Sequence, residues 1–192
     1  MKNSLRKLNI IIIITYSIIL LLVLYFQKGQ NVFFNKPALL FYPIAFIAGI
    51  ISIALEYFTG ALLIFFKTKQ FPRGFNIHAV YSGSKINIID ILIIILLVIA
   101  EELVFRQVLF SFFFTGIKLS LWLAVILCTL IYAGIHIYFG LKTIPQKIVS
   151  GLLYVCLFYF SGMSIIIPII THCVQNLSLV VITMIRERKI QA

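Results

Sequence analysis

The chain has 192 residues, of which 62% are hydrophobic and only 11% charged. Soluble domains are about 45–50% apolar and about 25% charged, so this composition excludes an ordinary soluble protein; it is also too hydrophobic for a disordered one. The 16 basic residues outnumber the 5 acidic ones, for a net charge of +11. They lie in short loops between apolar runs, which is typical of residues that set membrane topology. We therefore expect the lipid bilayer, and no nucleic acid, as a partner.

The apolar runs predict an all-α, polytopic transmembrane helix bundle of about six spans. A helix needs ~20 residues to cross a bilayer. The first run follows a basic start but exceeds a signal-peptide core and lacks a cleavage site, so we expect it to be retained. The third run is interrupted by charges at 101–106. The expected spans are approximately Leu8–Phe26, Ala38–Phe66, Asn87–Ile117, Leu119–Phe139, Ile144–Phe160 and Ser164–Ile185.

The second span has two unusual features. It is long and contains Gly49 and Gly60, so we expect it to tilt or break. It also carries Glu56 deep inside, where an acid either lines the interior or faces a lysine near the interface. The longest polar stretch, Lys67–Lys85, follows this span and is too short to form a domain.

The positive-inside rule orients the bundle. With the N-terminus in the cytoplasm, twelve of the sixteen Lys and Arg residues fall on the cytoplasmic side and three on the other side. We therefore expect both termini in the cytoplasm. The predicted organisation is N-terminal spans and a cytoplasmic loop at 1–86, a helical core at 87–185, and a basic cytoplasmic tail at 186–192.

The third span carries three charged residues close together. A charge at the bilayer centre costs roughly 2.5–3.5 kcal/mol, so such residues face the bundle interior and usually serve a function. Glu102 and Arg106 are four residues apart and can form an ion pair on one helix face. Glu101 is turned about 100° away, which leaves it the freer carboxylate and suits it to general acid–base work. Asp90, near the cytoplasmic start of this span, is expected to be hydrated.

Two other spans carry imidazole groups. His136 lies on the fourth span, and His172 and Asn176 share a face of the sixth, four residues apart. If these faces converge, Glu101 with His136 can activate a water, and His172 with Asn176 can stabilise an oxyanion, as amide hydrolysis requires. Glu101 lies about 21 Å along the third span whereas His136 lies near the cytoplasmic end of the fourth. Convergence therefore requires a third span that is tilted, broken or set deeper.

Each motif alone is more often structural than catalytic, but three of them on successive spans resemble the CPBP family of intramembrane proteases. That family includes the type II CAAX prenyl endopeptidases and many Abi-type bacterial proteins. Its pattern is Glu-Glu-x-x-x-Arg, Phe-x-x-x-His and His-x-x-x-Asn. Here the first motif occupies 101–106 and the third 172–176, while Tyr132 replaces the Phe of the second motif, which ends at His136. The resemblance covers about Asp90–Val181.

The resemblance implies an intramembrane endopeptidase acting on a membrane-associated or lipidated peptide or protein. It assigns water activation to Glu101 and His136, the oxyanion site to His172 and Asn176, and a supporting ion pair to Glu102 and Arg106. We favour a metal-free, glutamate-dependent mechanism. The alternative is a zinc ion bound by one residue from each motif: Glu101, His136 and His172.

Two other functions are also compatible with the sequence. A non-catalytic membrane protein of the same fold, for bacteriocin immunity or partner regulation, would use these residues as a structural polar network. A small transporter would use the Glu and His residues as a proton relay, but the chain shows no inverted repeat or paired broken helices. The Ile- and Lys-rich composition favours a multi-pass protein of a bacterial inner membrane.

Overall fold

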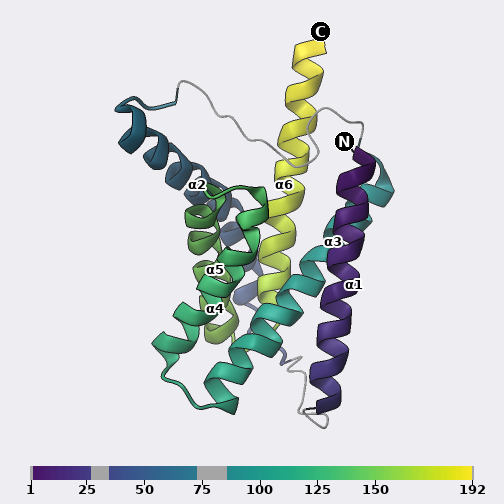
Figure 1. Cartoon of the computed structure of the whole chain (residues 1–192), viewed down its shortest axis with the longest axis vertical. Helices are drawn as coiled ribbons and strands as arrows, with labels where there is room; N and C mark the ends of the chain where they lie inside the picture. The colour runs from purple at the N-terminus through teal and green to yellow at the C-terminus, as the bar shows by residue number, and fades with distance from the viewer. Residues whose placement is uncertain (1, 27–34, 73–85, 192) are drawn as a thin grey trace.

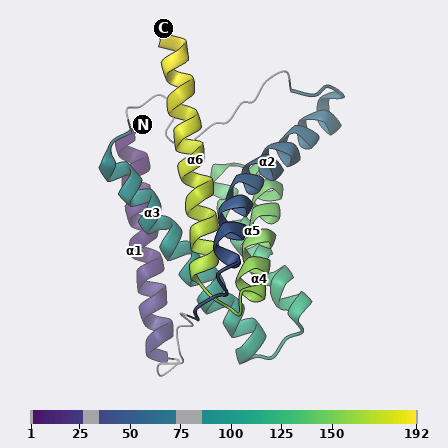
Figure 2. The same ribbon diagram turned by 180° about the vertical axis from the view of Figure 1, so that it is seen from behind.

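The computed structural model describes residues 2–26, 35–72 and 86–191, which form a helical bundle without strands (Figure 1). The all-α fold class is therefore confirmed for this part of the chain. Successive long helices run in alternating directions, and α1 begins at the same end of the bundle at which α6 finishes (Figures 1 and 2). The long helices are α1 (Lys2–Phe26), α2 (Phe41–Thr68), α3 (Ile88–Glu102), α4 (Leu121–Ile135), α5 (Thr143–Phe160) and α6 (Ile166–Gln191).

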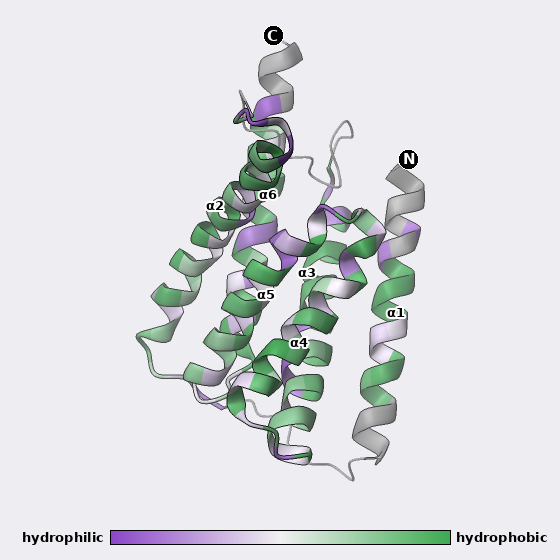
Figure 3. Cartoon of the chain, turned by 60° about the vertical axis from the view of Figure 1, so that its left-hand side comes forward, coloured by the Kyte–Doolittle hydropathy of each residue, from purple (hydrophilic) through white to green (hydrophobic). Residues whose placement is uncertain are grey.

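Among the residues that the structure describes, four helical segments are long and apolar enough to cross a membrane: Phe41–Thr68, Leu121–Phe139, Thr143–Phe160 and Ile166–Arg186. Within α1, the stretch Asn9–Leu21 is apolar as well. Apolar residues cover much of the length of the helices (Figure 3). These features make the chain an integral membrane protein. The six-span count and the cytoplasmic placement of both termini stay predictions, although an even number of crossings does bring the two ends to one side.

The third predicted span is a composite of α3 and two π-helical segments, η1 (Leu103–Phe110) and η2 (Phe112–Gly116). Together they cross the bundle obliquely (Figures 1 and 2). The oblique path is the tilt that the predicted convergence of the polar residues requires. The wide turns begin directly after Glu102, and π-helical turns inside helices are often found at functional sites.

The first turn of α3 corrects the expectation for Asp90. Its side chain is fully buried rather than hydrated. It accepts a hydrogen bond from the backbone N–H of Asn87 at 3.1 Å, while the Asn87 side chain accepts one from the Asp90 N–H at 3.0 Å. This reciprocal capping box satisfies two amide groups at the helix end, where no carbonyl partner exists within the helix.

Helix α2 leans outward toward Thr68 (Figure 1) but is unbroken, so the glycines do not interrupt it. A Cβ added to Gly49 would lie 2.6 Å from the Thr171 carbonyl oxygen and 2.7 Å from the Val174 Cβ. Glycine at this position therefore lets α2 pack directly on α6. The contact fixes the helix that carries the third motif.

The main hydrophobic cluster lies among η1, α4, α5 and the start of α6, next to the charged residues of the first motif. Its central members are fully or almost fully buried: Phe105, Phe110, Val125, Cys128, Tyr132, Tyr154, Val155, Phe158 and Ile165. Helix α1 joins it through Tyr16, whose ring meets Phe105 edge-on at 5.8 Å. The bundle therefore surrounds the polar residues with packed side chains.

Parts of the predicted organisation lie outside the described residues. These are residues 73–85 of the predicted cytoplasmic loop, and the side chains of 187–192, which make up most of the predicted basic tail. The division at 86 and 185 stays a prediction.

Candidate active site

Glu102 lies at the centre of a buried polar cluster. Its Oε1 accepts a hydrogen bond from the Arg106 guanidinium at 3.2 Å and another from His172 Nδ1 at 2.8 Å. The predicted ion pair is thus present, and both of its side chains are almost completely buried. The link to His172 joins the first and third motifs, which are 70 residues apart.

Two tyrosine rings enclose the Arg106 guanidinium. Its carbon lies 4.3 Å from the centre of the Tyr132 ring and 5.1 Å from that of Tyr154. One nitrogen also lies 3.5 Å from the carbonyl oxygen of Gly151. Cation–π contacts are strongest when desolvated, so they offset part of the cost of burying this charge. The aromatic ring of the second motif therefore supports the first motif.

His172 is held in one orientation. Its ring stacks on Tyr154 with centroids 4.8 Å apart. An ionised carboxylate only accepts hydrogen bonds, so Nδ1 carries the proton that is donated to Glu102. The opposite nitrogen, Nε2, lies 3.9 Å from Oε2 of Glu101. The carboxylate of Glu101 makes no hydrogen bond within the described residues, which agrees with its expected role as the freer acid.

His136 lies where α4 tightens into the 3₁₀ turn η3 (His136–Phe139). Its Nδ1 lies 2.8 Å from the backbone carbonyl oxygen of Tyr132, and its ring lies against the Tyr132 ring with centroids 4.8 Å apart. Since a carbonyl only accepts, Nδ1 is protonated, and in the neutral ring Nε2 keeps a free lone pair. The second motif thus presents a basic nitrogen.

Asn176, the last residue of the third motif, makes fewer contacts with the cluster. Asn176 follows His172 by one helical turn and is half-buried, and its side chain has no hydrogen-bond partner among the residues described. Its neighbour Gln175 is fully buried. The structure therefore brings Glu101, Glu102 and His172 together directly, whereas it joins Asn176 to them only through helix α6.

A second ion pair lies beside this cluster. The Lys147 ammonium of α5 donates to Oε1 of Glu56 in α2 at 2.8 Å, and the side chains are 17% and 15% exposed. Glu56 thus faces a lysine, one of its two predicted settings. Lys147 lies near the start of the fifth expected span, and the sequence analysis did not identify it as the partner of Glu56. The signal was the intramembrane acid itself, which needs a cation nearby.

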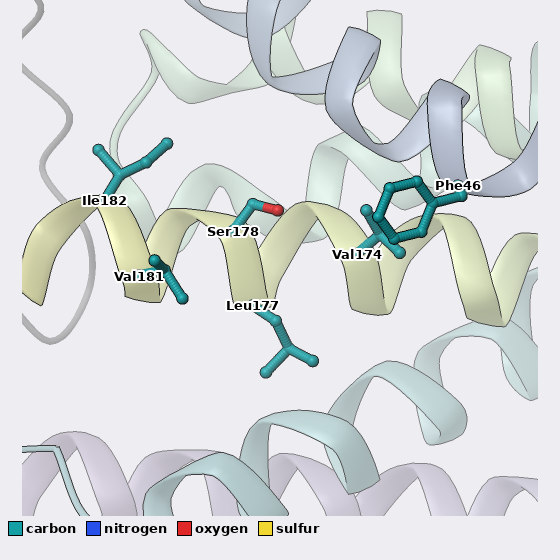
Figure 4. Close-up of a pocket in the computed structure, with 6 residues that line it drawn as sticks. All are labelled: Phe46, Val174, Leu177, Ser178, Val181 and Ile182. Atoms are coloured by element: carbon teal, nitrogen blue, oxygen red, sulfur yellow. The ribbon is translucent and has the colours of Figure 1, made fainter.

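An apolar groove of about 420 Å³ lies where Phe46 of α2 meets α6 (Figure 4). None of the cluster residues lines it. Its α6 residues are Val174, Leu177, Ser178, Val181 and Ile182.

The residues considered for zinc do not form a ready metal site. Across the described ranges, no three His, Cys, Asp or Glu side chains lie in an arrangement that could hold a metal ion. Glu101, His136 and His172 therefore do not fit zinc in this conformation.

The fold and this cluster define a helical integral membrane protein with buried acid, imidazole and guanidinium groups contributed by separate helices. Residues 84–178 match the model of the type II CAAX prenyl endopeptidase Rce1-like family. Through this segment, which contains all three motifs, the chain belongs to the type II CAAX prenyl endopeptidase family. No curated protein and no solved structure gives a match. Helices α1 and α2, including Glu56, lie outside the matched segment.

Proposed function

We propose that this chain is an intramembrane endopeptidase that hydrolyses a peptide bond of a membrane-associated or lipidated peptide or protein. Membership of the family implies a CAAX-type endopeptidase in general terms. The observation that carries the proposal for this chain is the unbonded Glu101 carboxylate facing His172 Nε2 at 3.9 Å. A water set to one side of this gap can lie ~2.8 Å from both atoms, within hydrogen-bond range.

In the proposed reaction, Glu101 takes a proton from water while the free Nε2 of His136 helps to orient it. The resulting hydroxide attacks the carbonyl carbon of the scissile peptide bond. The oxyanion that forms accepts hydrogen bonds from His172 Nε2–H and from the Asn176 amide. Protonated Glu101 then gives its proton to the amide nitrogen, the C–N bond breaks, and a carboxylic acid and an amine are released.

Charge balance supports this use of His172. Glu101 and Glu102 carry two negative charges against one positive charge on Arg106. In the proposed mechanism a second proton on His172 balances the remainder, and both ring nitrogens then donate. One N–H is held by Glu102, which leaves the other to meet the oxyanion. A buried cluster of zero net charge avoids the large cost of an uncompensated charge in a low dielectric.

The test is cleavage by the purified protein in detergent of a quenched peptide library with and without a prenylated cysteine near the C-terminus. We expect Glu101→Gln to lower kcat by at least about 10³, since it removes the general base and keeps the shape. The matched control is Glu187→Gln, which removes an equal charge near the end of α6 and should cleave like the wild type.

The two main alternatives have different outcomes in this assay. Cleavage that a strong chelator abolishes and zinc restores would replace the proposed mechanism with a metal-dependent one. Equal cleavage by wild type and Glu101→Gln would remove Glu101 from the mechanism. A wild type that binds these peptides without cutting any of them would favour a binding protein of the same fold.

A further inference from the structure

The Glu56–Lys147 pair places a lysine cation beside the proposed active site. Lys147 precedes Gly151 by four residues on α5, so the two share a helix face. That face meets the cluster, because the Gly151 carbonyl oxygen approaches Arg106 and its Cα packs against Tyr132. The ammonium of Lys147 is also within electrostatic reach of Glu101 and His136.

Glu101 is the natural competitor for this cation. It has no hydrogen bond among the described residues, and Lys147 carries its charge on a flexible four-carbon stem. A lysine paired with Glu101 would hold the carboxylate as an acceptor and block its access to water. In the structure Lys147 points instead to Glu56, at 2.8 Å. The side chains of Ser150 and Gln175 also lie near the Glu56 carboxylate.

We infer that Glu56 is a positioning residue that holds Lys147 away from Glu101 and so keeps the proposed general base free. This inference rests on the proposed function. It assigns a role in the site to α2, which lies outside the segment that matches the family. The role acts through Lys147, and Glu56 itself need not touch the substrate.

The inference predicts that Glu56→Gln is less active than either Lys147→Met or the double variant. Glu56→Gln frees Lys147 to pair with Glu101 and should lower kcat at least tenfold, with little change in KM. Lys147→Met removes the competing cation and should stay within about threefold of wild type. The double variant Glu56→Gln/Lys147→Met should recover to the level of Lys147→Met, because no cation is left to block Glu101. Lys69→Met, at the exposed end of α2, is the control for loss of a lysine.

Each other order overturns the inference. If Lys147→Met falls as far as Glu56→Gln, the cation itself is needed. If the double variant stays as low as Glu56→Gln, the carboxylate acts by another route, such as helix packing. If Glu56→Gln keeps wild-type activity, Glu56 has no positioning role. Rates are normalised to folded protein, measured by thermal unfolding, so that a loss of stability is not taken for a loss of activity.

A second measurement needs no substrate and separates this inference from the proposed function. In the wild-type background Glu56 holds Lys147, so Lys147 should contribute little to the change in unfolding temperature that Glu101→Gln causes. In the Glu56→Gln background the new Lys147–Glu101 pair should make Glu101→Gln clearly more destabilising, and Lys147→Met should abolish that extra effect. Equal effects of Glu101→Gln in both backgrounds would overturn the inference even if peptide cleavage is established.

Discussion

The contact between α5 and the second motif gives the sharpest test of the packing around the cluster. A Cβ on Gly151 would lie 2.7 Å from Cδ1 of the Tyr132 ring, whereas carbon atoms pack at about 3.5–4.0 Å. The ring must therefore move by about 1 Å. It has little free space to do so, because Tyr132 is fully buried and its ring covers the Arg106 guanidinium at 4.3 Å.

We expect Gly151→Ala to cost about 1–3 kcal/mol, the usual range for overpacking. For a chain of this length, 1 kcal/mol shifts the melting temperature by roughly 2–4 °C, so the expected decrease is about 2–12 °C. Activity should fall further. A displacement of about 1 Å can cost ~10²-fold in rate, and the Tyr132 ring supports both Arg106 and His136.

The assay is thermal unfolding in detergent together with peptide cleavage, with Gly134→Ala as the matched control. A Cβ on Gly134 meets no heavy atom within 4 Å, and alanine favours a helix by up to ~1 kcal/mol over glycine. The control should be as stable as wild type or slightly more stable. A Gly151→Ala protein with wild-type melting temperature and activity would refute the close packing of Tyr132 on α5.

Two further predictions concern the buried ion pair and the topology. Glu102→Leu leaves the Arg106 guanidinium buried without its counter-charge and should cost about 3–5 kcal/mol, whereas adding Arg106→Met should recover much of this loss; equal melting temperatures of single and double variants would contradict the pairing. All of these variants should lose cleavage, because His172 loses its hydrogen-bond partner. For topology, a membrane-impermeant maleimide should label Lys118→Cys in intact cells but Lys142→Cys only after the cells are opened, and the reverse pattern would invert the bundle.

The sequence by itself determined the fold class and the local pairs. Runs of about twenty apolar residues specify helices because only helices or closed barrels satisfy backbone groups in lipid. The spacing of four between Glu102 and Arg106 specifies their ion pair because both lie within one helix. The three motifs also specified the family, since their order along the chain needs no knowledge of the packing.

Only the tertiary structure decided how the helices share their polar groups. Helices that are apolar on nearly every face do not specify which side meets which neighbour, and run length alone does not set tilt or depth. Glu102 meets His172, and Glu56 meets Lys147, across 70 and 91 residues of chain. The first contact joins the oblique helix α3 to α6 (Figure 1), and the second joins α2 to α5. The physical reason is that relative rotation and depth come from packing between helices, which no single segment encodes.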